Sequence, residues 1–420
     1  MTSFFRDKIF YGWVIVFAGL IISIMGIGSR YCFGVFLKSL EADFGVSRAS
    51  SSGIFSLYML LSSFIAILGG WALDRYGPKK VALLMATFTG ISFIFTSLAA
   101  APWQLFITYS LILSLGTGPT YGLANSTSAR WFVKKRGLVV GITSSGGGLG
   151  AIVLAPFAAY LVSQYGWRTA FVIFGCILLI FMAAMALILK KDPSDMGLLP
   201  DGVKSSQAPH VTHQPDSPGL PSDFSLSQAC RMHQFWLLGF NWIFLSLSLH
   251  MVFVHIVPYA IDAGLSAMDA SFVISLIGAA NIPGRLVVGQ FSDTFGRKAL
   301  AVNCTLIHCL SLIWLLWASE PWQLFMFGIA FGFLWGGSGT VITAYIGDIF
   351  GTRSLGAIMG VISGCWAFGA AAGPALGGFL YDFSGPYLSA FALGAFSLLI
   401  AALVIIPIKK ARSTALKTRR

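Results

Sequence analysis

Long apolar stretches, separated by short polar segments, make up most of this chain. A helix of about 20 residues crosses a bilayer, and on this criterion we predict twelve spans. They cover approximately residues 10–37, 51–73, 81–100, 103–126, 137–163, 169–189, 235–260, 270–291, 299–317, 322–347, 355–381 and 386–408. No small-residue cleavage site follows the first span, so we expect a membrane anchor and not a removed signal peptide. The pattern predicts an all-α membrane protein embedded in the lipid bilayer.

The composition supports this prediction. The 420 residues are 56% hydrophobic and only 10% charged, which is far more apolar than a soluble domain needs. The net charge of +12 does not indicate nucleic acid, because only Lys38, Arg48 and Arg168 among the basic residues fall in predicted outer loops. Loops rich in lysine and arginine face the cytoplasm. We therefore expect an inner-membrane protein with both termini in the cytoplasm.

Two similar halves are indicated by a repeated loop motif. The pattern G-x-x-x-D-x-x-G-x-K occurs at residues 70–79 and again at 289–298. Asp74 and Asp293 stand at the same offset as Gly166 and Gly385, so one ancestral unit has been duplicated. We predict two pseudo-symmetric six-helix bundles, residues 1–190 and 233–420, joined by a polar cytoplasmic linker at 191–232 that is rich in proline.

The motifs of enzymes and of cofactor sites are missing from the sequence. The glycine-rich run at 146–150 lacks the G-x-x-x-x-G-K-[ST] pattern of a phosphate loop, and small residues there let helices approach closely. The six cysteines form no C-x-x-C pair. Paired acids and nucleophile–base pairs do not stand out either. We expect no enzyme activity, no cofactor, no metal site and no disulfide framework.

Arg285 carries the main functional hypothesis. It is a full charge inside the predicted span 270–291, where it costs at least ~2.5–3.5 kcal/mol unless it faces protein, water or a partner. Asn281 lies one turn earlier on the same helical face. No acid is predicted mid-membrane, so an anion from solution is the natural counter-ion, and the planar guanidinium fits a carboxylate. The alternative is that Arg285 bonds backbone carbonyls of a neighbouring helix.

Other polar and aromatic side chains in the spans are weaker candidates for the same site. His250 is preferred over His255 because it lies nearer the middle of its span, and either can donate to a carboxylate or carry a proton. Tyr121 lies on a polar face of its span with Thr117 and Asn125. The remaining candidates are Tyr31, Tyr345, Cys365, Trp366 and Phe368. For each of these, helix packing is the alternative role.

The paired loop motif on a six-plus-six plan resembles the major facilitator superfamily. Within it, residues 131–141, leading into 145–150, and the Gly12-Trp13 opening of the first span are similar to the monocarboxylate transporter family. Asn281 and Arg285 fall where that family has an acid and an arginine, and Tyr31 falls on its first-span lysine. The resemblance implies a bacterial lactate carrier of the major facilitator fold. Both departures bear on proton coupling.

The sequence favours a secondary carrier of a small monocarboxylate, such as lactate or pyruvate, moved with a proton by a monomer. Asp74, Arg75, Asp293 and Arg297 are expected to be gate residues, since charges in these loops can pair with helix ends. The first alternative is a carboxylate exchanger of the oxalate–formate type, for which Arg30 would be the second cation. The other alternative is a membrane receptor that binds without transport.

Overall fold

The structure, a computed structural model, describes residues 10–133, 135–202, 224–318, 320–351 and 354–408, and every regular element in these ranges is helical. Ten of the described helices are long and apolar enough to cross a membrane. One of them, at Gly137–Ile188, contains two predicted spans, which are joined at Gly166. The predicted span at 103–126 is divided among shorter consecutive helices. The predicted all-α membrane architecture is confirmed.

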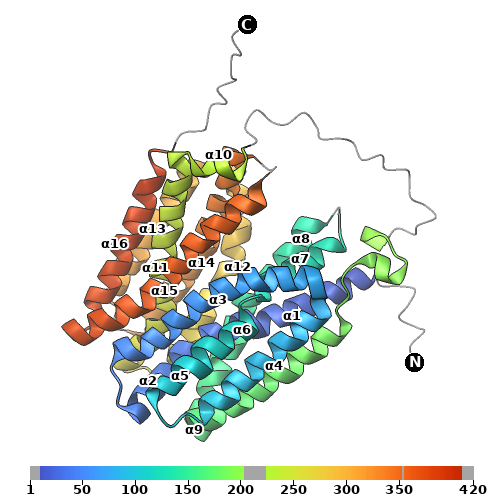
Figure 1. Ribbon diagram of the computed structural model, residues 1–420. Helices are drawn as coiled ribbons and strands as arrows, with labels where there is room; N and C mark the ends of the chain where they lie inside the picture. Colours follow the sequence, from blue (N-terminus) through green and yellow to red (C-terminus); the bar gives the residue numbers. More distant parts are fainter. Residues whose placement is uncertain (1–9, 134, 203–223, 319, 352–353, 409–420) are drawn as a thin grey trace. The chain divides into compact units, whose positions relative to one another are not determined.

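The chain divides into two compact units (Figure 1). The first unit is Met1–His210 with Phe253–Ala279, and the second is Val211–Val252 with Ala280–Arg420. The division passes through two helices, α11 (His233–Asp262) and α12 (Ala267–Phe295). The other helices of the first unit are α1 (Tyr11–Tyr31), α2 (Phe33–Phe44), α3 (Arg48–Tyr76), α4 (Pro78–Ser97), α5 (Pro102–Leu105), η1 (Phe106–Ile112), α6 (Leu113–Thr117), α7 (Thr120–Arg130), α8 (Arg136–Ser144), α9 (Gly146–Ile188), η2 (Pro193–Met196) and η3 (Pro200–Gly202).

Helix α1 packs on α9 through glycine. A Cβ atom added at Gly28 would lie 2.6 Å from the Cα of Gly150, and one at Gly150 would lie 2.5 Å from the Cα of Gly28. A Cβ added at Gly146 would lie 2.4 Å from the Cβ of Ser23. Side chains at these positions would therefore push the two backbones apart. The glycine-rich run lets two helices approach closely, as predicted.

A π-helix, η1, interrupts the predicted span at 103–126, which consists of several short helices. It covers Phe106–Ile112, between α5 and α6. Such helices are rare and often occur at functional sites. Tyr109 and Ser110 are the residues of η1 that are buried. The hydroxyl of Ser110 donates to the backbone carbonyl of Ile54 at 2.7 Å, which fixes η1 against α3.

The second unit contains α10 (Leu226–Cys230), α13 (Arg297–Leu315), α14 (Pro321–Phe350), α15 (Leu355–Ser384) and α16 (Leu388–Ile405), besides its parts of α11 and α12. Helix α13 packs against α14 and α16. The backbones of α12 and α14 also meet closely. A Cβ added at Gly284 would lie 2.1 Å from the carbonyl oxygen of Phe333.

The predicted duplication is visible in the backbone at two pairs of glycines. Gly77 and Gly296 have φ angles of 81° and 87°, and Gly166 and Gly385 have φ angles of 75° and 80°. Residues other than glycine rarely adopt positive φ. Each pair ends or interrupts a helix at equivalent points of the two repeats, which explains why glycine stands at all four positions.

The predicted linker is described at its two ends, by η2 and η3 and by the segment from Phe224 to α10. Residues 203–223 lie outside the described part of the chain. The carboxylate of Asp201 accepts a hydrogen bond from the backbone N–H of Val133 at 3.1 Å. This first part of the linker is therefore tied to the end of α7.

Candidate functional site

Arg285 and Asn281 face each other on α12. The Nε–H of Arg285 donates to Oδ1 of Asn281 at 2.9 Å. Asn281 is only 3% exposed, and its buried Nδ2 has no hydrogen-bond partner. Among the described residues, the terminal nitrogens of Arg285 also have no acceptor. An amide and a guanidinium therefore present several N–H donors that have no acceptor among the described residues.

Gly336 of α14 packs against Asn281. A Cβ added at Gly336 would lie 2.2 Å from the carbonyl oxygen of Asn281 and 3.0 Å from its Nδ2. Pro283 removes one backbone donor from the same turn of α12. The close approach of α14 holds Asn281 in place, and among the described residues its Nδ2 has no hydrogen-bond acceptor.

His250 lies on α11 in the second unit and is 3% exposed. Its Nδ1 lies 2.9 Å from the carbonyl oxygen of Ser246. A carbonyl only accepts, so Nδ1 carries the proton and, in the neutral ring, Nε2 is the nitrogen that can take up another. The hydroxyl of Ser246 in turn donates to the carbonyl of Trp366 at 2.7 Å, and the His250 ring meets the Trp366 ring edge-on at 5.7 Å.

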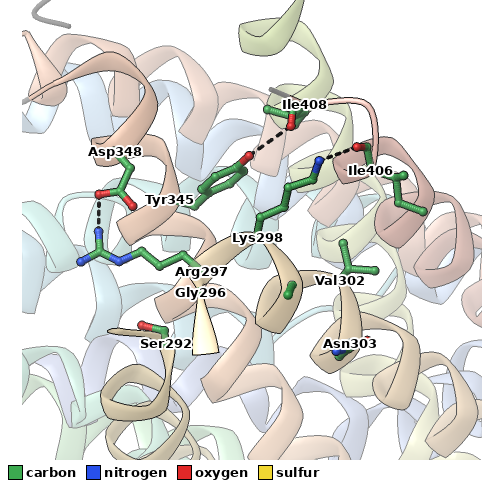
Figure 2. Close-up of a pocket in the computed structure, with 11 residues that line it drawn as sticks. Ser292, Gly296, Arg297, Lys298, Val302, Asn303, Tyr345, Asp348, Ile406 and Ile408 are labelled. Atoms are coloured by element: carbon green, nitrogen blue, oxygen red, sulfur yellow. Dashed lines mark hydrogen bonds and ion pairs between the residues drawn. The ribbon is translucent and has the colours of Figure 1, made fainter. Parts of the chain in front are cut away.

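The other candidates of the second unit do not join Arg285. Tyr345 is 3% exposed and its hydroxyl donates to the carbonyl of Ile408 at 3.3 Å. Cys365 lies against Gly239 of α11, where an added Cβ would be 3.0 Å from its sulfur. Phe368 is 65% exposed. Tyr345 thus lies with the charged residues of the α12–α13 turn, in the open pocket drawn in Figure 2.

The first unit holds the remaining candidates. Tyr31 stacks on Phe253 with ring centroids 4.2 Å apart. His255 is fully buried, and its Nε2 lies 3.4 Å from the hydroxyl of Ser52. Tyr121 is 56% exposed, and its oxygen accepts a hydrogen bond from Ser144 at 3.4 Å. Tyr31 and His255 are therefore packed side chains here, whereas Tyr121 presents its ring at the surface of its unit.

The loop motif of the first repeat forms an ion pair. A carboxylate oxygen of Asp74 lies 2.8 Å from a guanidinium nitrogen of Arg130. The backbone carbonyl of Asp74 also accepts from Lys191 at 3.0 Å. Arg75 lies over the rings of Trp71 and Tyr76, each centroid at 5.7 Å. The pair joins the end of α3 to the end of α7.

The second repeat carries an ion pair of opposite polarity, shown in Figure 2. Arg297, at the start of α13, lies 2.6 Å from the carboxylate of Asp348 near the end of α14. Lys298 donates to the carbonyl of Ile406 at 2.6 Å. These residues line an open pocket of about 910 Å³. Arg297 and Lys298 already have acceptors, so this pocket is better suited to an ion pair that forms and breaks than to binding an anion. The side chain of Asp293 lies outside the described residues.

Comparison with known proteins places the chain in a family. The sequence profile of the Major Facilitator Superfamily matches residues 16–341 and 286–420. The chain belongs to this superfamily. Its members are transporters, so the expectations of transport and of no enzyme activity are both confirmed at this level. The helices described above are those of a multi-pass membrane transporter.

Curated relatives of the superfamily match nearly the whole chain. Monocarboxylate transporter 12 of Xenopus laevis is 26% identical over 417 residues, covering 94% of this chain and 88% of the relative. An uncharacterized transporter of Escherichia coli strain K12, YhjX, is 28% identical over 351 residues, covering 82% of each. The predicted resemblance to proteins named monocarboxylate transporters is confirmed.

Solved structures agree on the fold. A D-xylose–proton symporter superposes with a TM-score of 0.74 at 14% identity, covering 97% of this chain and 100% of that one. A bacterial homologue of the lysosomal transporter Spinster, inward-facing and unoccupied, superposes with a TM-score of 0.68 at 16% identity, covering 94% and 95%. These similarities show the major facilitator fold.

Sequence analysis did not find the partners of the loop charges. Arg130 and Asp348 end α7 and α14, the two repeat-equivalent helices, and each pairs with a motif residue. The two residues lie at equivalent positions of the two repeats, and this equivalence could have indicated from the sequence that both pair with a loop motif. Sequence analysis also did not single out Tyr109, a buried phenol on η1 with an unpartnered hydroxyl. The π-helix that positions it has no sequence pattern.

Proposed function

We propose that this protein is a secondary carrier that moves a small monocarboxylate, lactate or pyruvate in the simplest case, together with a proton. It would work by alternating access of two six-helix bundles, residues 1–190 and 233–420, as a monomer in the inner membrane with both termini in the cytoplasm. The names of the matched monocarboxylate transporters support the substrate class. The observation that carries the proposal is the Arg285–Asn281 pair.

One carboxylate satisfies the donors of this pair. Arg285 keeps its terminal nitrogens for two parallel hydrogen bonds, which is the geometry that a guanidinium offers to a carboxylate. Asn281 fixes the Nε side of the guanidinium and leaves its own Nδ2–H as a further donor. A guanidinium inside a membrane span is costly without a counter-ion, so the bound anion offsets this cost.

His250 is the proposed proton carrier. With its Nδ1–H held by the carbonyl of Ser246, the ring can gain a proton only at Nε2. Asn281 cannot carry the proton, because an amide does not titrate. Under this proposal the coupling proton binds an imidazole or enters with the substrate as the neutral acid. His255, which is buried beside Ser52, is not assigned this role and serves as the control histidine in the test below.

The ion pairs Asp74–Arg130 and Arg297–Asp348 are proposed as latches of the transport cycle. Each joins a loop motif to the end of another helix of its own unit. Arg75, which lies over aromatic rings, and Asp293 are proposed to belong to the same gates. Exposed pairs of this kind contribute only ~0–1 kcal/mol, so they can break and re-form during turnover.

The test is uptake of labelled L-lactate into proteoliposomes, with and without an inward proton gradient. We expect saturable, gradient-stimulated uptake by the native protein and loss of uptake in Arg285→Gln. The matched control is Arg168→Gln, which removes an exposed arginine paired with Asp43 and should transport normally. His250→Gln should keep counterflow of lactate but lose stimulation by the gradient, whereas His255→Gln should keep both.

Three results would contradict the proposal. Lactate uptake that ignores the proton gradient excludes symport. Normal uptake by a folded Arg285→Gln protein excludes Arg285 as the anchor. Exchange of labelled oxalate without lactate uptake selects the second candidate, the dicarboxylate exchanger. This candidate is favoured by Arg30, a second arginine in a predicted span whose buried Nε has no acceptor among the described residues.

A further inference from the structure

Arg30 lies near the end of α1, inside the first unit, and its guanidinium has no acceptor in the part of the chain that the structure describes. Its Nε is fully buried and makes no hydrogen bond. The guanidinium lies over Tyr58, whose ring centroid is 5.9 Å from Cζ. A cation–π contact offsets part of the cost of the charge, but it gives the buried N–H no acceptor. The side chain as a whole is partly exposed, so an ion can reach it.

Tyr109 also packs against the ring of Tyr58. Its centroid is 5.8 Å from that of Tyr58. The side chain is 2% exposed and its hydroxyl has no hydrogen-bond partner. An unmade hydrogen bond on a buried hydroxyl costs about 1–3 kcal/mol. The rings of Phe33 and Phe93 also pack on Tyr109, at 5.0 Å and 6.1 Å, so a phenylalanine would fill this place without that cost.

The hydroxyls of Tyr58 and Thr117 make no hydrogen bond to Arg30 or Tyr109. Thr117 donates its hydroxyl hydrogen to the carbonyl of Leu113 at 3.0 Å. The 2.7 Å contact between Tyr58 and Thr117 is therefore a donation by Tyr58. Arg30 and Tyr109 thus both lie near the Tyr58 ring, and neither the buried Nε of Arg30 nor the hydroxyl of Tyr109 has an acceptor among the described residues. Such a set fits a small anion, which accepts both hydrogen bonds and neutralises the charge.

The π-helix η1 is an independent sign that this place is specialised. It breaks the regular hydrogen bonding of its span at the residues that place Tyr109 in the interior. π-Helical segments are rare and are frequently found at functional sites. The segment is fixed to α3 by the hydrogen bond from Ser110 to Ile54. The position of the phenol is thus set by the backbone.

We propose that Arg30 and Tyr109 form a carboxylate-binding site within the first unit, separate from the Arg285–Asn281 pair. The ligand class follows the proposed function, but the site does not depend on Arg285. Arg30 contributes the charge and Tyr109 a directed hydroxyl donor, while Tyr58 lies beside the guanidinium. The ligand expected at this site is a small carboxylate such as oxalate.

The experiment measures binding of oxalate to purified protein by calorimetry, in the Arg285→Gln background. This background removes the site of the proposed function, so any remaining binding belongs elsewhere. We expect saturable binding that weakens at least about tenfold when Arg30→Gln is added, the loss of a hydrogen bond to a charged group. Tyr109→Phe should weaken it by a smaller factor, and Arg168→Gln should change nothing.

Absence of saturable oxalate binding in the Arg285→Gln protein overturns this proposal, whatever happens to lactate uptake. Binding that survives Arg30→Gln overturns it as well. If Arg30→Gln does not fold, Tyr109→Phe decides, because it removes only the hydroxyl from an aromatic cluster: unchanged affinity then contradicts the site. The function proposed for Arg285 is tested separately by its own uptake assay, so the two can fail independently.

Discussion

The contact between Gly336 and Asn281 gives the most direct structural prediction. A methyl group at position 336 would lie 2.2 Å from the carbonyl oxygen of Asn281 and 3.0 Å from its Nδ2. Ordinary contacts between such atoms are about 3.5 Å, so Gly336→Ala must separate α12 and α14 by roughly 1 Å there. The backbone cannot rotate away as a long side chain could. We expect this shift to move Asn281, and Arg285 bonded to it, away from the positions in which they would bind the carboxylate of the substrate.

The expected effect has two parts. Overpacking of a close contact costs about 1–3 kcal/mol of stability. Displacement of a binding group by about 1 Å lowers activity by up to about 100-fold, and we expect lactate uptake to fall by at least tenfold. The assay compares initial uptake rates in proteoliposomes at equal amounts of monodisperse protein, with the unfolding temperature in detergent measured in parallel.

Gly339→Ala is the matched control on the same helix. A Cβ at Gly339 meets nothing within 4 Å, so the methyl group should leave transport unchanged. It should also raise the unfolding temperature slightly, because alanine is favoured over glycine in a helix by roughly 0.5–1 kcal/mol. Equal transport by Gly336→Ala and Gly339→Ala would refute the reasoning that the α12–α14 contact positions Asn281.

Two further predictions concern the turns and charges of the repeats. Gly296→Ala should lower the unfolding temperature, because φ at this position is 87° and the left-handed region costs about 1–2 kcal/mol for alanine. A Cβ there meets nothing within 4 Å, so no steric clash adds to this backbone strain. An unchanged unfolding temperature would contradict the predicted strain. For Arg297 and Asp348, which are about one third exposed, a double-mutant cycle by SDS-induced unfolding should give a coupling below about 1 kcal/mol. A much larger value would show a structural pair that cannot act as a latch.

Much of the fold could be predicted because the bilayer constrains the sequence strongly. Apolar runs of spanning length and glycines at repeated offsets predict the helices and the duplication, since in a membrane nearly every backbone donor must be satisfied within a helix. Gly166 is the clearest case, because this single residue lies between two predicted spans and its φ of 75° favours glycine.

The details of the site were harder to predict. The facing of Arg285 and Asn281 follows from helical periodicity, which places residues four apart on one face, and the 2.9 Å hydrogen bond agrees with it. Tyr345 donates to the carbonyl of Ile408, which is distant in sequence. For His250, the question is which ring nitrogen faces the carbonyl of Ser246. Periodicity gives no information on either. The proposed roles of these residues in binding stay predictions.

The π-helix η1 also bears on how the chain aligns with its relatives. A hydrogen bond from i to i+5 places one more residue in a turn than the regular α-helical bond does, so η1 accommodates residues that a regular span would not contain. A relative with an uninterrupted helix should therefore align with a gap inside 106–112. Without the extra residue, the phenol at position 109 would point about a quarter-turn away, and the proposed site beside Arg30 would lose its hydroxyl donor. The length of this seven-residue segment, more than its composition, is the trait to compare among homologues.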